Sequence, residues 1–392
     1  MKIGYLHIGS PKHGICRYGR ILASAAARNE NLNIIEASVT ITDNYLDNKK
    51  KLVLAAQKLS QADVVHLQFS RFNKGLWGEG KKLINHLKTF LNYCSSPIIV
   101  TLHDVFYPQY SLNRLIKLGF KGSEQTKFSL LEFAIEFRRA IKNFFEPDLI
   151  ALRKLSSKAK FFMVCTSEEA SRLREHVEGN KLIVVPHFVE AREISNLNYK
   201  ESRRQLNLPE NNKIITLLGF IYPTKGHELL IESLAKLPKD IQVVFAGGSS
   251  SEKYEHYVEE LWMLARQKKV NDRLRITGYL SEIELEKYLV ATDLAVCPFS
   301  RFSASGSVST WISAKCPILT SDFPQINEYN SLVQGAIQIF SPYSADALAV
   351  AIIQSLGKIT ESKPKVAQLR KKLLITNILE RHLAFYKQAI DC

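Results

Sequence analysis

A lysine between two glycines supplies the clearest anion-binding chemistry in this sequence. Lys225 lies in the segment GFIYPTKG, residues 219–226, which follows the apolar run IITLL and precedes a helical pattern over residues 227–237. Glycines let the backbone approach a ligand closely, and the N-terminus of the next helix adds free N–H groups to the lysine charge. The pattern predicts that Gly219, Lys225 and Gly226 bind phosphate. The alternative is an ordinary strand-to-helix loop with a surface lysine.

A second loop, SRFSASGSV at residues 300–308, places hydroxyl groups around a glycine at a predicted helix start. It follows the strand pattern DLAVCPF, and the backbone N–H and side-chain O–H groups of Ser305, Gly306 and Ser307 can donate to anion oxygens. Serine-rich loops are also common as plain helix caps. Because both loops follow parallel strands of one domain, we expect them to meet at the carboxyl edge of the same sheet.

The first half of the chain carries a third candidate group. His103 and Asp104 follow the strand pattern IIVTL, and Gly14 ends the loop GSPKHG that follows the N-terminal strand. Functional groups concentrate at such strand ends in doubly wound sheets, so we expect His103 to orient a substrate hydroxyl or phosphate. The alternative is that it caps a helix or bonds a backbone carbonyl. His66 and His187 also follow strands and are weaker candidates for such a role.

These groups require parallel strands alternating with helices. In the first half, strands are predicted at residues 1–8, 63–69, 97–102, 161–165 and 182–185. In the second half, they are predicted at IITLLGF, VVFAGG, LRITGYL, DLAVCPF, CPILTSD and AIQIF. Such alternation gives parallel sheets with right-handed crossovers. Since 392 residues exceed what one core organises, we predict two doubly wound α/β domains.

The predicted domains cover residues 1–195 and 196–370. The polar, proline-containing segment 188–212 fits a linker followed by a helix. Apolar residues at helical spacing near the end predict that residues 371–392 form a C-terminal helix packed at the domain junction.

Composition favours a soluble globular protein of the cytoplasm. The hydrophobic fraction is 46%, no stretch approaches the ~20 apolar residues that span a bilayer, and the N-terminal apolar run is too short for a signal peptide. The six cysteines lack metal-ligand spacing, so we expect reduced, mostly buried thiols.

The net charge of +15 is concentrated in the first half, where residues 1–195 hold 29 Lys and Arg against 18 Asp and Glu. Residues 114–160 alone carry 11 basic against five acidic residues, with aromatic and aliphatic residues at helical spacing. Such a segment fits a peripheral helix on an anionic membrane, here at its inner face. A helix packed on its own sheet with a solvated basic face is the alternative. Without a nucleic-acid module, no nucleic-acid partner is expected.

In their order and spacing, these segments resemble the family 4 glycosyltransferases (glycosyl transferases group 1), which are retaining enzymes. The segments that carry the resemblance across almost the whole chain are HGICRYGRILA, VVHLQF, VTLHD, VCTSEEASRLR, IVVPHFV, LLGFIYPTKGHELLIESL, VVFAGG, ITGYL, DLAVCPFSRFSASGS and KCPILTSDFPQINE. The resemblance implies the GT-B fold, in which two Rossmann-like domains face each other across a cleft. It also implies sugar transfer from a nucleoside diphosphate sugar to a saccharide or lipid-linked saccharide.

The resemblance assigns roles to the candidate residues. Lys225 would hold the donor diphosphate, and His103 would approach the sugar near the reacting centre, so these two are the expected catalytic residues. Gly14 would give the donor room in the first domain. The other expected donor-binding residues are Gly219, Gly226, Ser305, Gly306, Ser307 and Glu328.

Two departures from the family pattern favour an alternative function. Phe220 stands where many relatives have an arginine, and Phe302 and Thr310 stand where the family has a pair of glutamates. A catalytically weak or inactive subunit that binds a nucleotide sugar or a partner protein is therefore the alternative, and a nucleotide-sugar epimerase is a further one. No Asp-x-Asp motif ends a strand, and such enzymes usually need no divalent ion, so neither a metal nor a cofactor besides the sugar donor is expected.

Overall fold

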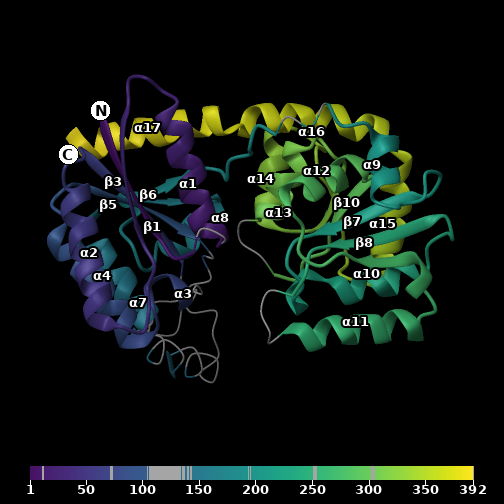
Figure 1. The fold of residues 1–392 in the computed structure, drawn as a ribbon, viewed down its shortest axis with the longest axis horizontal. Coiled ribbons are helices and arrows are strands. Elements are labelled where there is room, and N and C mark those ends of the chain that lie inside the picture. The colour runs from purple at the N-terminus through teal and green to yellow at the C-terminus, as the bar shows by residue number, and fades with distance from the viewer. Residues whose placement is uncertain are drawn as a thin grey trace, which may run out of the picture. The chain divides into compact units, whose positions relative to one another are not determined.

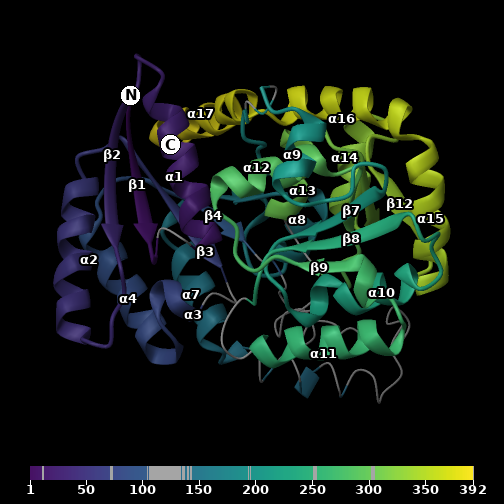
Figure 2. The same cartoon turned by 45° about the vertical axis from the view of Figure 1, so that its right-hand side comes forward.

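The computed structural model contains two compact units. It describes residues 1–10, 13–70, 74–103, 105, 134, 137–138, 141, 144–192, 194, 196–249, 254–301 and 305–391. One unit comprises Met1–Pro186 and Thr376–Cys392, and the other comprises His187–Ile375. Each has a six-stranded parallel sheet with helices on both faces (Figures 1 and 2). The predicted fold class of two doubly wound α/β domains is confirmed.

The division between the units differs from the predicted boundary at residue 195. Val189 already belongs to the second unit, because its N–H donates to the Leu373 carbonyl and its carbonyl accepts from the Ile375 N–H. The polar composition of residues 188–212 predicted a linker and gave no sign of this backbone pairing. The predicted C-terminal helix is present as Ile375–Asp391, and from Thr376 onward it belongs to the first unit.

The strands of the first unit follow the order β2-β1-β3-β4-β5-β6. Their bounds are Lys2–Ile8 for β1, Asn33–Val39 for β2, Val64–Ser70 for β3, Ile98–His103 for β4, Ala159–Val164 for β5 and Leu182–Val184 for β6. The order reverses between β1 and β3, so that ligand-binding loops are expected where these strands end.

The helices α2 and α8 of the first unit begin at side-chain caps. Asn44 accepts from the Asp47 N–H at the start of α2, and Thr166 and Glu169 form a capping box at α8. The bounds are Gly14–Ala27 for α1, Tyr45–Leu59 for α2, Lys74–Trp77 for α3, Gly80–Tyr93 for α4, Pro147–Ser156 for α7, Ser167–Leu173 for α8, Gly179–Lys181 for the 3₁₀ turn η2 and Ile375–Asp391 for α17.

The two faces of the first sheet differ in polarity. Leu67 and Phe69 of β3 join the apolar core together with side chains of α2, α4 and α7. His66 and Gln68, which alternate with these two residues along β3, project to the opposite face, where Tyr386 of α17 bonds His66. One face is therefore an apolar core, and the other holds a row of buried polar side chains.

The strands of the second unit follow the order β12-β11-β10-β7-β8-β9. Their bounds are Lys213–Leu218 for β7, Ile241–Ala246 for β8, Leu274–Ile276 for β9, Leu294–Cys297 for β10, Ile318–Ser321 for β11 and Gln338–Phe340 for β12. In chain order this is the 3-2-1-4-5-6 arrangement of dinucleotide-binding folds, with the switch point between β7 and β10.

Helices cover both faces of the second sheet. The 3₁₀ turns are Pro223–Lys225 (η3) and Asn271–Arg273 (η5). The α-helices are Tyr199–Gln205 (α9), His227–Leu234 (α10), Glu255–Gln267 (α11), Glu282–Ala291 (α12), Gly306–Ser313 (α13), Pro324–Leu332 (α14), Ala345–Gly357 (α15) and Ile359–Leu373 (α16). The apolar core of this unit lies beneath α10, α11 and α15.

A buried ion pair fastens the start of the second sheet. Arg203 on α9 is 0% exposed, and its guanidinium donates to Asp293 Oδ2 at 2.6 Å and to the carbonyl of Asn212 at 2.7 Å. Asp293 Oδ2 also accepts from the N–H of Ile214, in β7, at 2.7 Å. This pair joins α9 and the loop before β7 to the strand that carries the Lys225 loop.

Removing this guanidinium is predicted to destabilise the second unit. Arg203→Ala leaves the Asp293 carboxylate and several carbonyls without their partner, which should lower the free energy of unfolding by about 3–5 kcal/mol. Its neighbour Arg204 has a side chain that is 67% exposed, so Arg204→Ala should cost less than about 0.5 kcal/mol. Urea unfolding followed by circular dichroism measures both, and equal costs would contradict the assignment.

Candidate functional site

The loops after β7 and β10 are in direct contact at the switch point of the second sheet. The Ser300 N–H donates to the Thr224 carbonyl at 3.0 Å. Gly226 has φ +78°, and a Cβ built on it would lie 1.9 Å from the Pro298 carbonyl oxygen. Only glycine allows this approach. The sequence prediction that the two loops meet is therefore confirmed.

Predicted residues from both loops come together around Gly219. The Lys225 Nζ donates to Ser307 Oγ at 3.1 Å. Gly219 has φ +119°, and a Cβ there would lie 3.0 Å from Ser307 Oγ and 3.6 Å from Lys225 Nζ. A side chain at residue 219 would therefore crowd the ammonium group and the hydroxyl.

Lys225 is held in a poorly hydrated position. It follows two residues of the 3₁₀ turn η3, and its ammonium lies 4.1 Å from the centre of the Phe299 ring. Burial lowers its pKa from 10.5 to about 8, with a smaller opposing effect from Cys297. The amine remains mostly cationic at pH 7, and the aromatic ring compensates part of its lost hydration.

Helix N-termini add hydrogen-bond donors to this cation. Ser305 caps α13, because its hydroxyl accepts from the Val308 N–H, and Gly306 and Ser307 form the first turn. Among the described residues, a Cβ on Gly306 would meet no atom within 4 Å. The helix α10 begins directly after Gly226. Two helix N-termini and one ammonium group form a site suited to a phosphate.

Glu328 and His187 lie on elements next to this site. Glu328 is in the second turn of α14, which follows β11, the strand beside β10. His187 Nδ1 lies 3.1 Å from Ser309 Oγ on α13 and 2.9 Å from the Phe188 carbonyl. Burial lowers the His187 pKa, so the neutral ring acts as a hydrogen-bonding support for α13.

Of the two positions where the family has glutamates, the structure describes only that of Thr310. Phe302, with Ser303 and Ala304, lies outside the described residues. Thr310 is on α13, and its hydroxyl donates to the Gly306 carbonyl of the preceding turn at 2.8 Å. Its hydroxyl is therefore turned to its own helix. Phe220, in the place of the family's arginine, is 46% exposed.

The candidate residues of the first unit also lie at strand ends. Gly9 has φ +97° and leads into the loop before α1, where Gly14 is the first helical residue. A Cβ on Gly14 would meet no atom of the described residues within 4 Å, and its donor role stays a prediction. Pro11, Lys12 and Asp104 lie outside the described residues.

His103 is the last residue of β4 and is 8% exposed. Its Nε2 lies 2.7 Å from the amide oxygen of Gln68, and the edge of its ring meets Tyr18 of α1, with ring centres 5.0 Å apart. Because an amide oxygen only accepts, the His103 Nε2 carries the hydrogen. The sequence prediction singled out His103 but missed Gln68, which fixes its tautomer.

Gln68 belongs to a longer buried hydrogen-bond chain. Its Nε2 donates to His66 Nε2 at 3.3 Å, and the Thr101 hydroxyl lies 2.7 Å from the same nitrogen. His66 Nδ1 therefore carries the hydrogen and donates to the Tyr386 hydroxyl at 2.6 Å. Burial holds the His66 pKa well below its usual value, so the ring is neutral and each bond has a defined direction.

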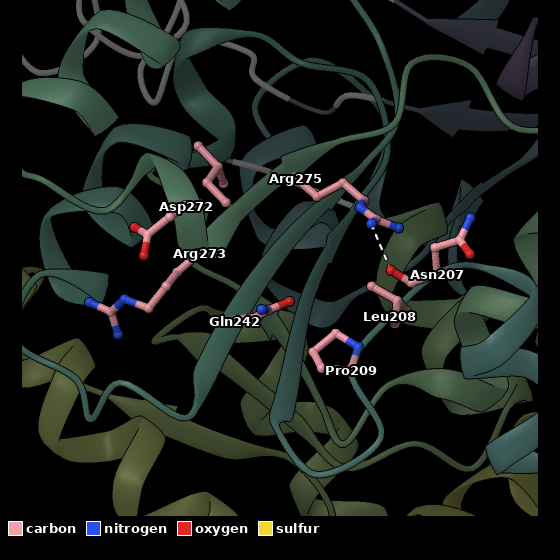
Figure 3. Close-up of a pocket in the computed structure, with 8 residues that line it drawn as sticks. Asn207, Leu208, Pro209, Gln242, Asp272, Arg273 and Arg275 are labelled. Atoms are coloured by element: carbon pink, nitrogen blue, oxygen red, sulfur yellow. Dashed lines mark hydrogen bonds between the residues drawn. The ribbon is translucent and has the colours of Figure 1, made fainter.

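The cavity in Figure 3 lies away from these residues. It has a volume of about 440 Å³ and is lined by residues such as Gln242, Arg273 and Arg275. These lie at the beginnings of β8 and β9, whereas the phosphate loops follow strand ends. Arg275 donates to the Asn207 carbonyl at 2.8 Å (Figure 3). The cavity contains none of the predicted site residues.

Three further features concern the described part of the chain. It contains no group of three or more His, Cys, Asp or Glu residues placed to hold a metal ion. None of its helices combines the length and apolarity that crossing a membrane requires. Cys16, Cys94, Cys165, Cys297 and Cys316 are free thiols, and all but Cys94 are buried.

The sequence of the second unit matches a known family. Residues 198–371 match the family described as glycosyl transferases group 1, so the predicted resemblance is confirmed there. The chain is 26% identical over 266 residues to a D-inositol 3-phosphate glycosyltransferase of Corynebacterium glutamicum, covering 59% of this chain and 60% of that protein. The chain thus spans less than two thirds of this relative's length.

Solved structures match the fold over the whole chain. The complex of Anabaena Alr3699/HepE with UDP and glucose has a TM-score of 0.69 at 13% identity, covering 99% of this chain and 100% of that one. A glycosyltransferase from Rickettsia africae has a TM-score of 0.70 at 14% identity, covering 99% and 98%. At these identities the likeness establishes the fold, which is GT-B.

Loss of the Gln68 amide is predicted to disturb His103 specifically. Gln68→Leu removes the acceptor of the His103 Nε2–H, so the ring should no longer be held in that tautomer, and unfolding should become easier by about 1–3 kcal/mol. Nitrogen-15 NMR of the histidine side chains reports the tautomer, and urea titration reports stability. The exposed Gln61 provides the control Gln61→Leu. An unchanged His103 tautomer in Gln68→Leu would refute the role given to Gln68.

Proposed function

We propose that this chain is a GT-B glycosyltransferase that moves a sugar from a nucleoside diphosphate sugar to a saccharide or lipid-linked saccharide. The contact between Lys225 and Ser307 at the switch point carries the proposal. It joins the two phosphate-binding loops in the unit whose sequence matches glycosyl transferases group 1. The donor diphosphate would bind there, between the N-terminal turns of α10 and α13.

The same groups would stabilise the departing nucleotide. Breaking the bond between the sugar and the diphosphate increases the negative charge on the phosphate oxygens. The Lys225 ammonium, the Ser307 hydroxyl and the N–H groups of two helix N-termini can meet that charge without moving far. With the charge met in this way, we propose a reaction that needs no metal ion. That the reaction retains the anomeric configuration is proposed from the resemblance to the family 4 glycosyltransferases.

The first unit would hold the acceptor and contact the donor sugar. His103, fixed as the Nε2–H tautomer by Gln68, would contact the sugar through its other ring nitrogen or its main chain. Gly14 provides open space at the start of α1 for the donor. In the second unit, Glu328 would approach the donor from α14. These roles extend the family's pattern to matching positions of this chain.

UDP-glucose is the first donor to test. The Anabaena protein was solved with UDP and glucose, and its fold matches this chain. A thermal-shift screen of UDP, GDP and their sugars would identify the base, since selective binding raises the melting temperature. Product analysis with donor alone and with saccharide acceptors would then separate transfer from epimerisation.

A second candidate function is nucleotide-sugar binding without efficient transfer. Phe220 replaces the arginine of many relatives, and Thr310 has its hydroxyl bonded to its own helix where relatives carry a glutamate. Only Lys225 then supplies positive charge among the residues assigned to the diphosphate. Binding of UDP-sugars without hydrolysis or transfer to any acceptor would favour this candidate over the enzyme.

Nucleotide binding should depend on Lys225. Lys225→Met keeps the apolar stem, which fits beside Phe299, but removes the charge-assisted contact, so UDP binding should weaken by about 1–3 kcal/mol, or about 5- to 150-fold. Isothermal titration calorimetry measures the change. The matched control is Lys236→Met, because Lys236 is exposed and paired with Asp346 on the same unit. Equal UDP affinity of wild type and Lys225→Met would remove the phosphate site.

The lowered pKa of Lys225 predicts a pH-dependent affinity. In the nucleotide-free protein this pKa is about 8, and a bound diphosphate favours the charged form. UDP affinity should therefore be constant from pH 7 to about 8 and then fall by up to about tenfold per pH unit. Calorimetry between pH 7 and pH 9 tests the slope, which should be absent in Lys225→Met. The same slope in both proteins would assign it to another group.

A further inference from the structure

One helical layer of the first unit is strongly basic. The helices α2, α4 and α7 pack in a row on the apolar face of the sheet (Figure 1). Together they contain nine Lys and Arg residues against two Asp residues. The helices on the polar face, α1 and α17, contain four basic residues against two acidic ones. The excess of positive charge is therefore concentrated on one side of this unit.

The outer face of α2 combines these charges with exposed leucines. Leu46 is 69% exposed and Leu54 is 66% exposed, whereas Leu52 and Leu59 are buried against the sheet. At 100° per residue, the exposed lysines 49, 50 and 58 lie around the two leucines on the helix surface. Single exposed leucines are ordinary, but two on one helix among lysines form an amphipathic second face.

The adjoining helix ends continue this surface. Lys81 and Lys82 are exposed in the first turn of α4, and Phe145, two residues before α7, is 67% exposed. Because α2, α4 and α7 each follow a strand of the parallel sheet, their N-termini lie at its carboxyl edge. Gly14 and His103 lie at the same edge. The surface thus reaches the end of the unit that carries the acceptor-side candidates.

We propose that this surface docks the protein on an anionic lipid bilayer. The docking surface consists of Leu46, Leu54 and Phe145 with Lys49, Lys50, Lys58, Lys81 and Lys82. Each lysine near an anionic leaflet contributes about 1 kcal/mol, and leucines and phenylalanine can enter the boundary between headgroups and acyl chains. A nucleic acid would match the charge but would leave the leucines exposed. A bilayer matches both.

This surface lies mainly on α2 and α4, and Phe145 is its one residue from the segment that the sequence first assigned to a membrane. Residues 114–133 of that segment lie outside the described residues. The main part of the segment that the structure describes is α7. The purpose of docking rests on the proposed lipid-linked acceptor, because a bilayer surface would bring such a substrate to the edge that carries His103. The binding itself does not rest on that function.

Flotation with lipid vesicles tests the surface. Wild-type protein should float with vesicles of phosphatidylcholine mixed with phosphatidylglycerol at low salt, and should be released by high salt. Lys49→Glu/Lys50→Glu/Lys58→Glu should reduce the bound fraction at least about tenfold. Leu46→Ser/Leu54→Ser should also reduce binding. The matched controls in the second unit are Lys236→Glu/Lys239→Glu/Lys268→Glu and Ile283→Ser, and both should bind like wild type.

Three results would overturn the inference. Wild type could fail to float with the anionic vesicles, or float equally with phosphatidylcholine alone. The lysine variant of α2 could bind as well as wild type. The protein could bind duplex DNA but no vesicle, which would identify the basic surface with another polyanion.

Nucleotide titration separates this inference from the proposed function. The α2 variants should bind UDP like wild type. If flotation fails while transfer to a soluble acceptor proceeds, only the docking surface is wrong. If flotation succeeds and no nucleotide sugar binds, only the proposed function is wrong.

Discussion

The close approach of two backbones at the switch point governs the candidate donor site. Gly226 lies so near the Pro298 carbonyl that a side chain would overlap it, and the Ser300 N–H bonds the Thr224 carbonyl beside this contact. On the other side, a Cβ on Gly247 would lie 2.1 Å from the Gly219 carbonyl oxygen. The loop that carries Lys225 is therefore fixed from both sides. Within this loop the Lys225 ammonium donates to Ser307 Oγ.

Fixing the loop this way imposes a cost on the lysine. Burial removes hydration from its ammonium and lowers its pKa to about 8. A positive charge is therefore held at a poorly hydrated position. The same loss of hydration strengthens the attraction of this cation for a phosphate, because fewer water molecules compete and screen. The Phe299 ring, which lies beside the ammonium, compensates part of the lost hydration. An unfavourable feature of the free protein thus becomes a favourable one when an anion binds.

The sequence predicted the residues of this site better than their partners. Gly219, Lys225 and Ser307 follow strands in a recognisable pattern, and the carboxyl-edge rule brings them together without knowledge of the fold. The Gln68 contact of His103 was missed because it depends on the register of β3 against β4, which brings together residues that are 35 apart in the sequence. The bond from His66 to Tyr386 of α17 joins residues that are 320 apart. No local pattern encodes a contact across that separation. The edge strand β2 was missed because most of its side chains are at least partly exposed.

Alternation along one strand explains how the first unit serves two purposes. In β3, Leu67 and Phe69 enter the apolar core that supports α2, α4 and α7, so the outer faces of those helices are free to carry lysines and exposed leucines. His66 and Gln68, on the opposite face, form the polar chain that orients His103. A shift of one residue in the pairing of β3 would exchange these two sets. The register of this strand therefore couples the orientation of His103 to the support of the basic helical layer.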